Sequence, residues 1–484
     1  MIDQCLSAGT AAFSAQRFDE ALKLFLAGSC LEPGAVVFSR NAGATCAVTG
    51  QLDPSIRYFE RVAKLEPDSG TGFLEAGKAY LVKAEFQQAF DLLSVAVVMS
   101  PGHGSEMMYL ARAASGLSLV GRSVRLLDRA SCIDPSDHQV LFELGRSLRE
   151  ARQFQRGADV LRRAIVLEPN QVGALFTLGF CCLHLGDFAQ AWSLYEFRWK
   201  DREFLAENRD SPLQRWTGQP EIRGLRLLVF SEQGFGDTIQ FVRFTRELER
   251  FGADVTLLVP PGLVRLLGIP PGVSRVVSEL ASDETFHACC SLMSLPSIFN
   301  LLEASIVASR APYVAAPSRA IEHWKAHIGS ATLPRIGVCW SGSDNPRMPH
   351  RSISLKEFSQ VFVSGFEFIS LNKLVKPSDL CTLSELDGRL CHFGDELTDY
   401  SVTAGLIDLL DLVVTVDTSV AHLAGAMGKE VWILLPKAAD WRWLEDRSDS
   451  VWYERVRLFR QDRDADWKSV LEAVAAALIT RRAI

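Results

Sequence analysis

The sequence has little that would place the protein in a membrane, in an oxidising compartment or on a nucleic acid. No apolar run reaches membrane-spanning length, because the run 406–416 is interrupted by Asp408 and Asp411. The first residues lack the basic start and the apolar core of a signal peptide. The net charge of −7 offers no excess of positive charge for nucleic acid. We therefore expect a cytoplasmic protein with no membrane span and no nucleic-acid partner.

Cysteine is present, but not in a pattern that binds metal. The 11 cysteines are scattered, form no C-x-x-C pair, and include two adjacent pairs with poor spacing for zinc. Thiols among apolar neighbours act as small hydrophobic groups. The acidic residues Asp462, Asp464 and Asp466 are interpreted as a polar loop. We expect reduced thiols, no metal and no cofactor.

The chain does contain a repeat. At 484 residues it is too long for one core and predicts several domains. Prolines recur every 34 residues, at Pro33, Pro67, Pro101, Pro135 and Pro169. A small residue keeps the same spacing at Gly9, Gly43, Gly77, Ala111, Gly145 and Gly179, and a large one at Phe25, Phe59, Leu93, Leu127, Leu161 and Tyr195. Thirty-four residues is the period of the tetratricopeptide repeat, a pair of antiparallel helices.

We expect 1–205 to hold five full repeats and a partial sixth. The small residues let two helices approach, and the large ones fill the groove between them. Such an array bends into a superhelix, and its concave face is expected to bind a protein or peptide. No asparagine ladder or basic stripe along the array identifies the ligand. A short connector, 206–223, follows, and its Trp216 is expected to pack one domain on the other.

The rest of the chain alternates apolar strand-like runs with helical stretches, which predicts parallel sheets covered by helices. We expect two α/β lobes, 224–315 and 316–484, with a ligand cleft at the carboxyl ends of their strands. The predicted strands are 225–231, 254–259, 273–277, 335–340, 366–371, 412–416 and 430–435. A last amphipathic helix, about 467–478, is expected to dock on the lobes.

One stretch, 231–238, joins a predicted strand to a predicted helix through Gly234 and Gly236. A glycine turn in that place aims backbone N–H groups at an anion and allows close approach of a ligand. Asp237 stands at the mouth of the turn, either as a reactive acid or as the cap of the following helix. A dinucleotide-binding loop is excluded, because the third glycine of G-x-G-x-x-G would fall at Ile239.

Several further motifs follow this stretch in order. They are Trp340-Ser341-Gly342, Arg351-Ser352, Ser370-Leu371-Asn372-Lys373, the segment 416–425, Asp440-Trp441-Arg442-Trp443 and Trp452-Tyr453. Together with the repeats, they resemble bacterial tetratricopeptide-containing glycosyltransferases. These enzymes are related to the ADP-heptose heptosyltransferases and are similar in plan to the eukaryotic O-GlcNAc transferase. The resemblance implies a GT-B pair of Rossmann-like lobes and a nucleotide-sugar substrate.

The resemblance also implies that Asp237 is the general base for the acceptor hydroxyl, in a cleft that raises its pKa by desolvation. Asp417, Thr418 and Ser419 end one predicted strand and begin a helix. Hydroxyls, N–H groups and the helix dipole there suit the leaving phosphates, although the hydroxyls can equally cap the helix. His422 follows on the same helix, as a phosphate donor or as a buried structural group.

Positive charge at the ends of the second lobe's strands comes from Arg351 and Lys373, which would stabilise the departing phosphate. Ser341 and Gly342 end another strand, and their N–H groups are expected to face the donor. The loop before Arg351 departs from the family's usual spacing, and its Arg347 is interpreted as solvated. Four aromatic residues are expected to pack as core between the lobes, with stacking on a base or sugar as the alternative: Trp441, Trp443, Trp452 and Tyr453.

The first hypothesis is an inverting, metal-independent glycosyltransferase whose repeats recruit a protein acceptor, for example a Ser or Thr hydroxyl of bacterial flagellin or an adhesin. One alternative keeps the chemistry but transfers the sugar to lipopolysaccharide or another glycan. Another is a non-catalytic scaffold with a decayed transferase domain. ADP-heptose, UDP-hexoses and CMP-linked nonulosonic acids all remain possible donors.

Overall fold

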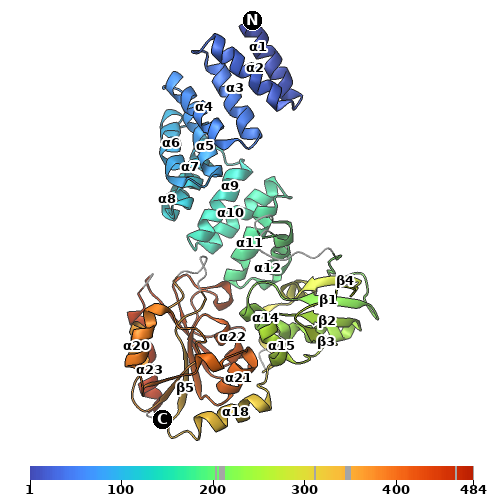
Figure 1. Cartoon of the computed structure of the whole chain (residues 1–484), viewed down its shortest axis with the longest axis vertical. Helices are drawn as coiled ribbons and strands as arrows, with labels where there is room; N and C mark the ends of the chain where they lie inside the picture. Colours follow the sequence, from blue (N-terminus) through green and yellow to red (C-terminus); the bar gives the residue numbers. More distant parts are fainter. Residues whose placement is uncertain (202–203, 206–212, 310–311, 344–349, 464–465, 483–484) are drawn as a thin grey trace. The chain divides into compact units, whose positions relative to one another are not determined.

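The computed structural model describes residues 1–201, 204–205, 213–309, 312–343, 350–463 and 466–482, and it divides into two compact units, 1–181 and 182–484 (Figure 1). Most of the connector's first half, the loop that holds Arg347, and Asp464 therefore lie outside the described residues. Among the residues that are described, no helix is both long and apolar enough to cross a membrane.

The first unit is a series of helix pairs, as the 34-residue period predicts. In chain order the helices are α1 (Ile2–Ser14), α2 (Phe18–Leu31), α3 (Val36–Val48), α4 (Leu52–Leu65), α5 (Thr71–Val82), α6 (Phe86–Met99), α7 (Gly104–Gly116), α8 (Val120–Ile133), α9 (His138–Glu150), α10 (Phe154–Leu167) and α11 (Val172–Leu185). The last of these begins in the first unit and ends in the second. Each second helix ends two residues before a repeat proline, as Leu31 does before Pro33. Proline disfavours helical geometry in the residue before it, which sets this ending.

Packing within each pair follows the predicted match of small and large residues. A methyl group added at Gly9 would lie 2.6 Å from the ring of Phe25. One added at Gly77 would lie 2.6 Å from Leu93. The large partners are buried, which leaves no room for a side chain at the small position. The repeat interpretation of these residues is confirmed.

The second unit opens with the repeat helix α12 (Phe188–Tyr195) and the 3-10 turn η1 (Glu196–Lys200). Its first sheet is parallel, with the order β3-β2-β1-β4. The strands are β1 (Arg226–Phe230), β2 (Asp254–Leu258), β3 (Arg275–Val277) and β4 (Ala288–Ser291). The strand β4 was not predicted, because its Ala-Cys-Cys-Ser contains no β-branched or aromatic residue.

Short helices accompany the first sheet. They are α14 (Phe235–Phe241), η2 (Val242–Phe251), α15 (Pro261–Leu267), η3 (Leu292–Ser294), α16 (Leu295–Ile298) and α17 (Glu303–Ala308). The connector joins this sheet, since the backbone N–H of Trp216 donates to the Cys289 carbonyl at 2.7 Å. The Trp216 ring packs against Phe251, with ring centroids 5.0 Å apart. Trp216 therefore packs on the first sheet's own elements, which corrects the expectation that it joins two domains.

The second sheet is also parallel, with the order β10-β9-β8-β5-β6-β7. Its strands are β5 (Arg335–Cys339), β6 (Glu367–Ser370), β7 (Leu390–His392), β8 (Leu412–Val416), β9 (Val431–Leu435) and β10 (Val456–Arg460). The two strands at its margins, β7 and β10, were not predicted. Both are short or carry charges, so their sequences lack the apolar run of a central strand.

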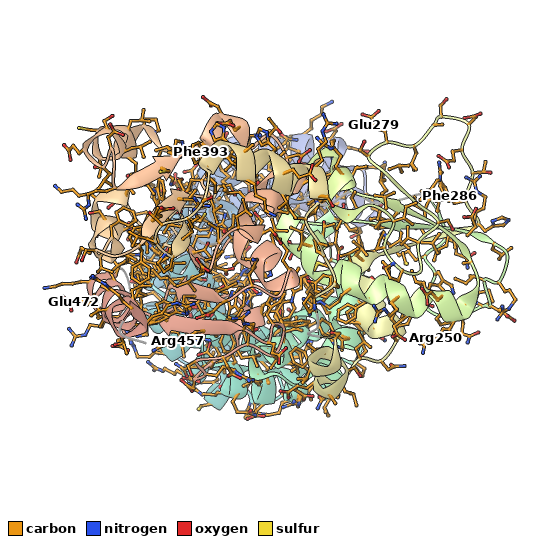
Figure 2. The ribbon with its side chains drawn as sticks, turned by 90° about the horizontal axis from the view of Figure 1, so that it is seen from below. Arg250, Glu279, Phe286, Phe393, Arg457 and Glu472 are labelled. Carbon is orange, nitrogen blue, oxygen red and sulfur yellow. The ribbon has the colours of Figure 1, made fainter. Side chains whose placement is uncertain are left out.

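Helices that accompany the second sheet are α18 (Ser318–Ile328), α19 (Leu355–Phe358), η4 (Ser359–Val361), η5 (Pro377–Asp379), α20 (Leu380–Glu385), η6 (Gly394–Glu396), α21 (Tyr400–Asp408), α22 (Ser419–Ala426), η7 (Trp441–Trp443) and α23 (Lys468–Arg482). In α23, Val470, Leu471, Val474 and Leu478 are buried in the sheet's core, which confirms the predicted docking helix. Figure 2 marks this sheet by Arg457 on β10 and Glu472 on α23, and the first sheet's region by Phe286 before β4.

Two glycine substitutions test the packing of the repeats. A methyl group at Gly145 would lie 2.4 Å from Leu161, so Gly145→Ala should lower the free energy of unfolding by about 1–3 kcal/mol. The control Gly121→Ala also lies in a helix, but its methyl group would meet nothing closer than Arg125 at 3.7 Å. It should be neutral or stabilise by up to about 1 kcal/mol. Urea unfolding followed by circular dichroism measures both, and equal effects would contradict this packing.

Candidate functional site

The carboxyl ends of the second sheet bring together four of the predicted donor-site residues. Ser341 and Gly342 follow β5, and Thr418 follows β8. A methyl group at Gly342 would lie 3.2 Å from the Arg351 guanidinium and 3.1 Å from the Thr418 side chain. Gly342 is therefore packed between Arg351 and Thr418, and the missing side chain lets them approach.

The N-cap side chain does not close the amino terminus of α22. Thr418 occupies the N-cap position, but its side chain makes no capping hydrogen bond. Its hydroxyl lies 3.3 Å from the Thr415 hydroxyl instead. The Ser419 hydroxyl lies 2.5 Å from the Tyr400 hydroxyl. The alternative that these residues merely cap the helix is thus not realised, and this terminus retains the positive end of the helix dipole.

Asn372 organises this edge of the sheet and was not singled out from the sequence. Its side-chain N–H donates to both the backbone oxygen and the hydroxyl of Ser341, each at 3.0 Å. Its amide oxygen accepts from the Trp340 N–H at 3.1 Å. The residue is 4% exposed, so these bonds satisfy a buried polar group. A signal was available, since Asn372 stands beside Lys373 in the quoted motif.

The two cations behave differently. Arg351 donates to the Ser343 carbonyl at 2.6 Å, and its buried Nε has no hydrogen-bond partner among the described residues. Lys373 is exposed and donates to the Thr398 carbonyl at 3.2 Å. Only Arg351 is in contact with the group formed by Gly342 and Thr418. The Gly342 N–H donates to the Ser352 hydroxyl at 3.2 Å, which corrects the expectation that it faces a donor.

The glycine stretch is the first turn of a helix rather than an open bend. Helix α14 begins at Phe235, so Gly234 is its N-cap and Asp237 its third residue. The Gly234 N–H donates to the Asp237 carboxylate at 2.8 Å. The capping interpretation of Asp237 is therefore confirmed. The N–H group that was expected to face an anion is already bonded to a carboxylate.

Gly236 serves helix packing. A methyl group there would lie 2.7 Å from the His422 ring, because α14 and α22 pack against each other. The expectation that Gly236 opens the loop to a ligand is corrected, since the space beside it is filled by His422. Close approach of two helices needs a residue without a side chain at the contact.

His422 is a buried structural group. It is 6% exposed, and its Nδ1 lies 2.9 Å from the Tyr453 hydroxyl. Its ring stacks on Trp443, with centroids 5.4 Å apart. Burial, aided by Arg442, lowers the pKa of His422 to about 3, so the imidazole is neutral. Of the two interpretations of this histidine, the structural one fits. The four late aromatic residues are all buried, as predicted: Trp441, Trp443, Trp452 and Tyr453.

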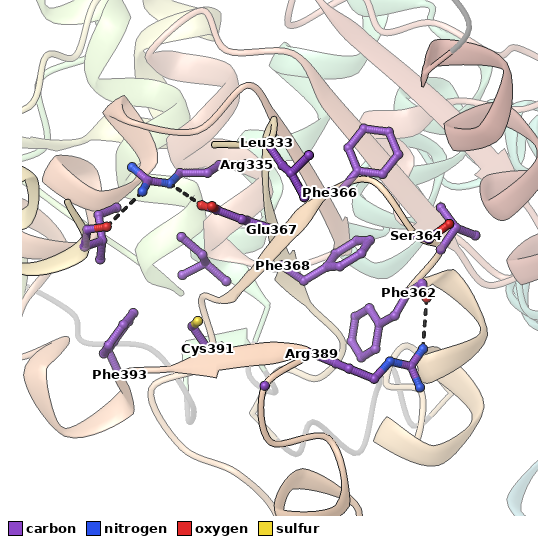
Figure 3. A pocket seen from close by; sticks show the side chains of 14 residues that line it. Leu333, Arg335, Phe362, Ser364, Phe366, Glu367, Phe368, Arg389, Cys391 and Phe393 are labelled. Carbon is purple, nitrogen blue, oxygen red and sulfur yellow. Dashed lines mark hydrogen bonds and ion pairs between the residues drawn. The ribbon is translucent and has the colours of Figure 1, made fainter. Parts of the chain in front are cut away.

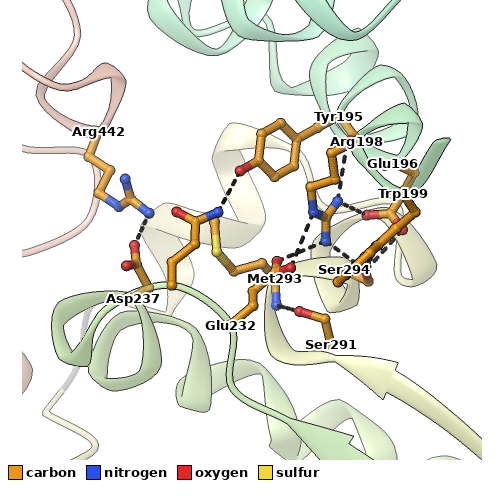
Figure 4. Close-up of polar contacts among 11 residues, drawn as sticks. Tyr195, Glu196, Arg198, Trp199, Glu232, Asp237, Ser291, Met293, Ser294 and Arg442 are labelled. Atoms are coloured by element: carbon orange, nitrogen blue, oxygen red, sulfur yellow. Dashed lines mark hydrogen bonds and ion pairs between the residues drawn. The ribbon is translucent and has the colours of Figure 1, made fainter. Parts of the chain in front are cut away.

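Arg442, which the sequence offered only as part of a motif, is the charged centre of this region. It forms ion pairs with Asp237 and with Asp440, the latter at 2.8 Å. Its Nε donates to the side chain of Gln240 at 2.6 Å. Figure 4 shows the Arg442 guanidinium pointing at Asp237. Burial raises the pKa of Asp237, and Arg442 opposes that shift.

Asp417 is the second buried carboxylate at this edge. It follows β8 and is 7% exposed. Burial, together with the like charge of Asp440, raises its pKa to about 7 against the opposing effects of Arg442 and Arg351. A carboxylic acid that titrates near neutral pH can donate or accept a proton under working conditions. Burial raises the pKa of both acids, but Asp237 is also held by an ion pair and by its cap bond to Gly234.

The loop before α14 is anchored by residues at the end of α12 and in η1. The guanidinium of Arg198 is fully buried and pairs with Glu232 at 2.9 Å and with Glu196 at 2.6 Å. Gln233, with a φ of 62°, donates to the Tyr195 hydroxyl at 3.0 Å. Figure 4 shows these contacts side by side with the pair formed by Asp237. The residues around a left-handed backbone position must hold it in place.

A cavity of about 590 Å³ lies elsewhere in the second sheet's region (Figure 3). Its lining includes Arg335 and Glu367, the first residues of β5 and β6, together with Phe362, Phe368 and Arg389. These are the amino ends of the strands, opposite to the edge that carries Ser341 and Asp417. None of the predicted site residues lines this cavity.

The first unit is an array of tetratricopeptide-type helix pairs, and the second unit contains two parallel sheets with helices. Residues 142–196 match the tetratricopeptide repeat family. Protein FlbA of Caulobacter vibrioides is 24% identical over 321 residues, which are 61% of this chain and 53% of FlbA. The chain thus spans about half the length of this curated relative.

Solved structures resemble a part of the chain. MamA from Desulfovibrio magneticus RS-1 is 18% identical and covers 35% of this chain and 96% of its own, with a TM-score of 0.34. A thermophilic TPR protein of Thermus thermophilus, TTC0263, is 14% identical and covers 38% of this chain and 100% of its own, with a TM-score of 0.32.

The raised pKa of Asp417 should be visible in the pH dependence of the protein's stability. An aspartate in the unfolded chain has a pKa of about 3.9, so as the pH rises the unfolded chain loses the Asp417 proton before the folded chain does. Folded Asp417 keeps its proton up to a pKa of about 7, and it therefore lowers stability progressively between those values. Relative to the natural protein, Asp417→Asn should gain several degrees in melting temperature at about pH 8, and little at about pH 4.

Asp440→Asn is the matched control. Burial would raise the pKa of Asp440, but Arg442 outweighs it and lowers that pKa. This group therefore adds stability that is lost as the pH falls, and its loss should be most costly at neutral pH. Thermal unfolding across the pH range measures both variants. Parallel pH profiles of the natural protein and Asp417→Asn would contradict the titration of Asp417.

Proposed function

We propose that the protein is a glycosyltransferase that moves a sugar from a nucleotide-sugar donor to a protein acceptor recruited by the repeats. The observation that carries the proposal is the convergence of Arg351, Gly342 and Thr418 at the uncapped amino terminus of α22. A helix terminus and a guanidinium at one point suit a diphosphate. The lobes would then form the GT-B pair of the resembling transferases.

The proposed chemistry is a direct displacement. The acceptor hydroxyl oxygen forms the new bond to the anomeric carbon, the bond from that carbon to the phosphate oxygen breaks, and the hydroxyl proton passes to a carboxylate. Arg351 and the α22 terminus would stabilise the charge that develops on the leaving phosphate. They supply positive charge that a metal ion supplies in other transferases, so we propose transfer without a metal.

Two carboxylates share the proposed site. Asp237 is proposed as the base, and its ion pair with Arg442 would hold it in one orientation. Asp417 is proposed to bind the donor, because an acid that titrates near pH 7 can donate a hydrogen bond to a sugar or phosphate oxygen when protonated. Lys373 would lie at the edge of the donor site, where it bonds to Thr398.

One observation favours a non-catalytic scaffold as the second candidate. Both oxygens of Asp237 already have partners, one in the N–H of Gly234 and the other in Arg442. Each carboxylate oxygen keeps a second lone pair, so these contacts explain Asp237 without a substrate but do not block a base. In a scaffold the same contacts would serve only to pack α14, and nucleotide binding would be absent.

Nucleotide binding tests the donor site. Calorimetry of the full chain against UDP, ADP, CMP and their sugar conjugates should find one that binds. Arg351→Ala should weaken that binding by about tenfold to a hundredfold, because it removes a charge-assisted contact. Arg389→Ala removes an arginine at the amino ends of the strands and should leave affinity unchanged. Absence of binding by every nucleotide would favour the scaffold.

Turnover separates the two acids. With the donor that binds, Asp237→Asn should lower kcat by at least about a hundredfold with little change in donor affinity, as the loss of a base does. Asp417→Asn should mainly weaken donor binding. Release of free nucleotide from the donor, measured with and without acceptor, reports both quantities. Full activity of Asp237→Asn would remove its assignment as the base.

A further inference from the structure

A row of basic residues follows the first helices of three consecutive repeats. Lys78 lies in α5, Arg112 in α7 and Arg146 in α9, each 34 residues after the last. These helices touch in series, α5 with α7 and α7 with α9. Equivalent positions on adjacent helices place the three cations on one continuous face. This corrects the expectation of an array without a basic stripe.

Aromatic and acidic side chains link the cations into a continuous row. The Lys78 ammonium lies 4.7 Å from the centre of the Tyr109 ring, and Arg112 lies 6.0 Å from the same ring. Arg112 approaches Glu143 at 3.6 Å, and Arg146 pairs with Glu143 at 2.6 Å. One carboxylate is thus shared by two guanidinium groups, which leaves the pair of arginines with an excess positive charge.

The row stays accessible to solvent. The side chains of Lys78, Arg112 and Arg146 are 29%, 44% and 32% exposed. Glu75 pairs with Lys78 at 2.7 Å, so two carboxylates stand against three cations. Glu143 itself is only 7% exposed, so an incoming carboxylate would bind the exposed sides of the two arginines and would not displace it. The buried Nε of Arg146 has no hydrogen-bond partner among the described residues.

Aromatic rings continue the row into the next repeat. The position that carries Arg146 in α9 carries Phe180 in α11, 34 residues on. Phe180 and Phe176 lie with ring centroids 5.0 Å apart. Both rings are partly exposed, which offers an apolar contact at the end of the charged row.

We propose that this face, formed by Lys78, Tyr109, Arg112, Arg146 and Phe180, binds an extended acidic peptide segment that ends in an aromatic or apolar side chain. Adjacent packed helices stand about 8–10 Å apart. In an extended polyproline-II segment, residues three apart share one side and are about 9 Å apart. The face therefore fits a segment with an acidic residue at every third position.

The carboxylates within the row favour a peptide over a nucleic acid. Glu143 and Glu75 would repel a continuous phosphate backbone, whereas a peptide can place neutral residues against them. This inference names the partner chemistry for the recruitment role proposed above. Its test needs neither donor nor sugar transfer, so failure of one proposal leaves the other standing.

Peptide binding to the full chain is the test. Fluorescence anisotropy would compare a labelled peptide with glutamate at every third position and a terminal phenylalanine with three others. These are an isomer of the same composition with adjacent glutamates, a lysine-for-glutamate version, and a single-stranded oligonucleotide. The spaced acidic peptide should bind most tightly, with affinity that falls as salt rises. Stronger binding of the lysine peptide or the oligonucleotide would overturn the proposal.

Substitutions test whether the peptide binds at the proposed basic face. The double variant Arg112→Gln with Arg146→Gln should weaken the spaced acidic peptide by about tenfold or more. The matched control is Arg129→Gln with Arg163→Gln, which removes two exposed arginines, also 34 residues apart, from the second helices α8 and α10. Its affinity should match that of the natural protein. Equal losses in both double variants would reduce the effect to net charge and overturn the site.

A third variant should increase the affinity for the acidic peptide. Glu143→Gln frees both arginines from their shared carboxylate and should tighten binding of the acidic peptide several-fold. A role confined to helix packing would not produce this gain. Thermal unfolding checks that each variant is folded, and sedimentation checks for self-association. Loss of self-association in the arginine double variant, without peptide binding, would identify a second copy of the chain as the occupant and overturn the peptide proposal.

Discussion

One buried arginine ties helix α14, beside the first parallel sheet, to the end of β9 in the second. Arg442 binds Asp237 and donates to Gln240, both of which belong to α14 beside the first sheet, while Arg442 itself follows β9 of the second. Breaking a buried ion pair on one side costs about 3–5 kcal/mol, because the other charge stays uncompensated. The packing of α14 on α22, with Gly236 against His422, is therefore secured by charge as well as by shape.

The same arginine divides the acids at this edge into two kinds. Asp237 and Asp440 are drawn into ion pairs with it, so their negative charge has a structural partner. Asp417 lies beside this cluster, is buried, and feels Asp440 as a like charge, and its pKa rises to about 7. Burial and like charge act in the same direction here. A carboxyl group that titrates near neutral pH can both donate and accept a proton at that edge of the sheet.

In the repeat array, both the packing residues and the exposed basic residues recur with the same 34-residue spacing. Pairs such as Gly77 with Leu93 hold the helices of a repeat together and vary little in character along the chain. Lys78 follows Gly77 directly, and Arg112 and Arg146 occupy the equivalent places, on the outside of that packing. A packing position accepts only side chains of a suitable size, whereas the exposed position beside it can vary and so can specify a ligand. One period thus builds the scaffold and spaces its binding groups.

The repeats, most strands and the helix α23 could be predicted from the sequence, because the repeat period and apolar runs are local signals. The strands β4, β7 and β10 were not predicted, because they are short or carry small or charged side chains and pair only with neighbours distant in the chain. For the site, the sequence singled out Arg351, Thr418 and Asp417, which the fold brings to one edge. The folded structure was needed to show that Asp237 caps a helix, that His422 is buried, and that Arg442 and Asn372 organise the edge. Those roles depend on contacts between residues far apart in the chain, which no local pattern encodes.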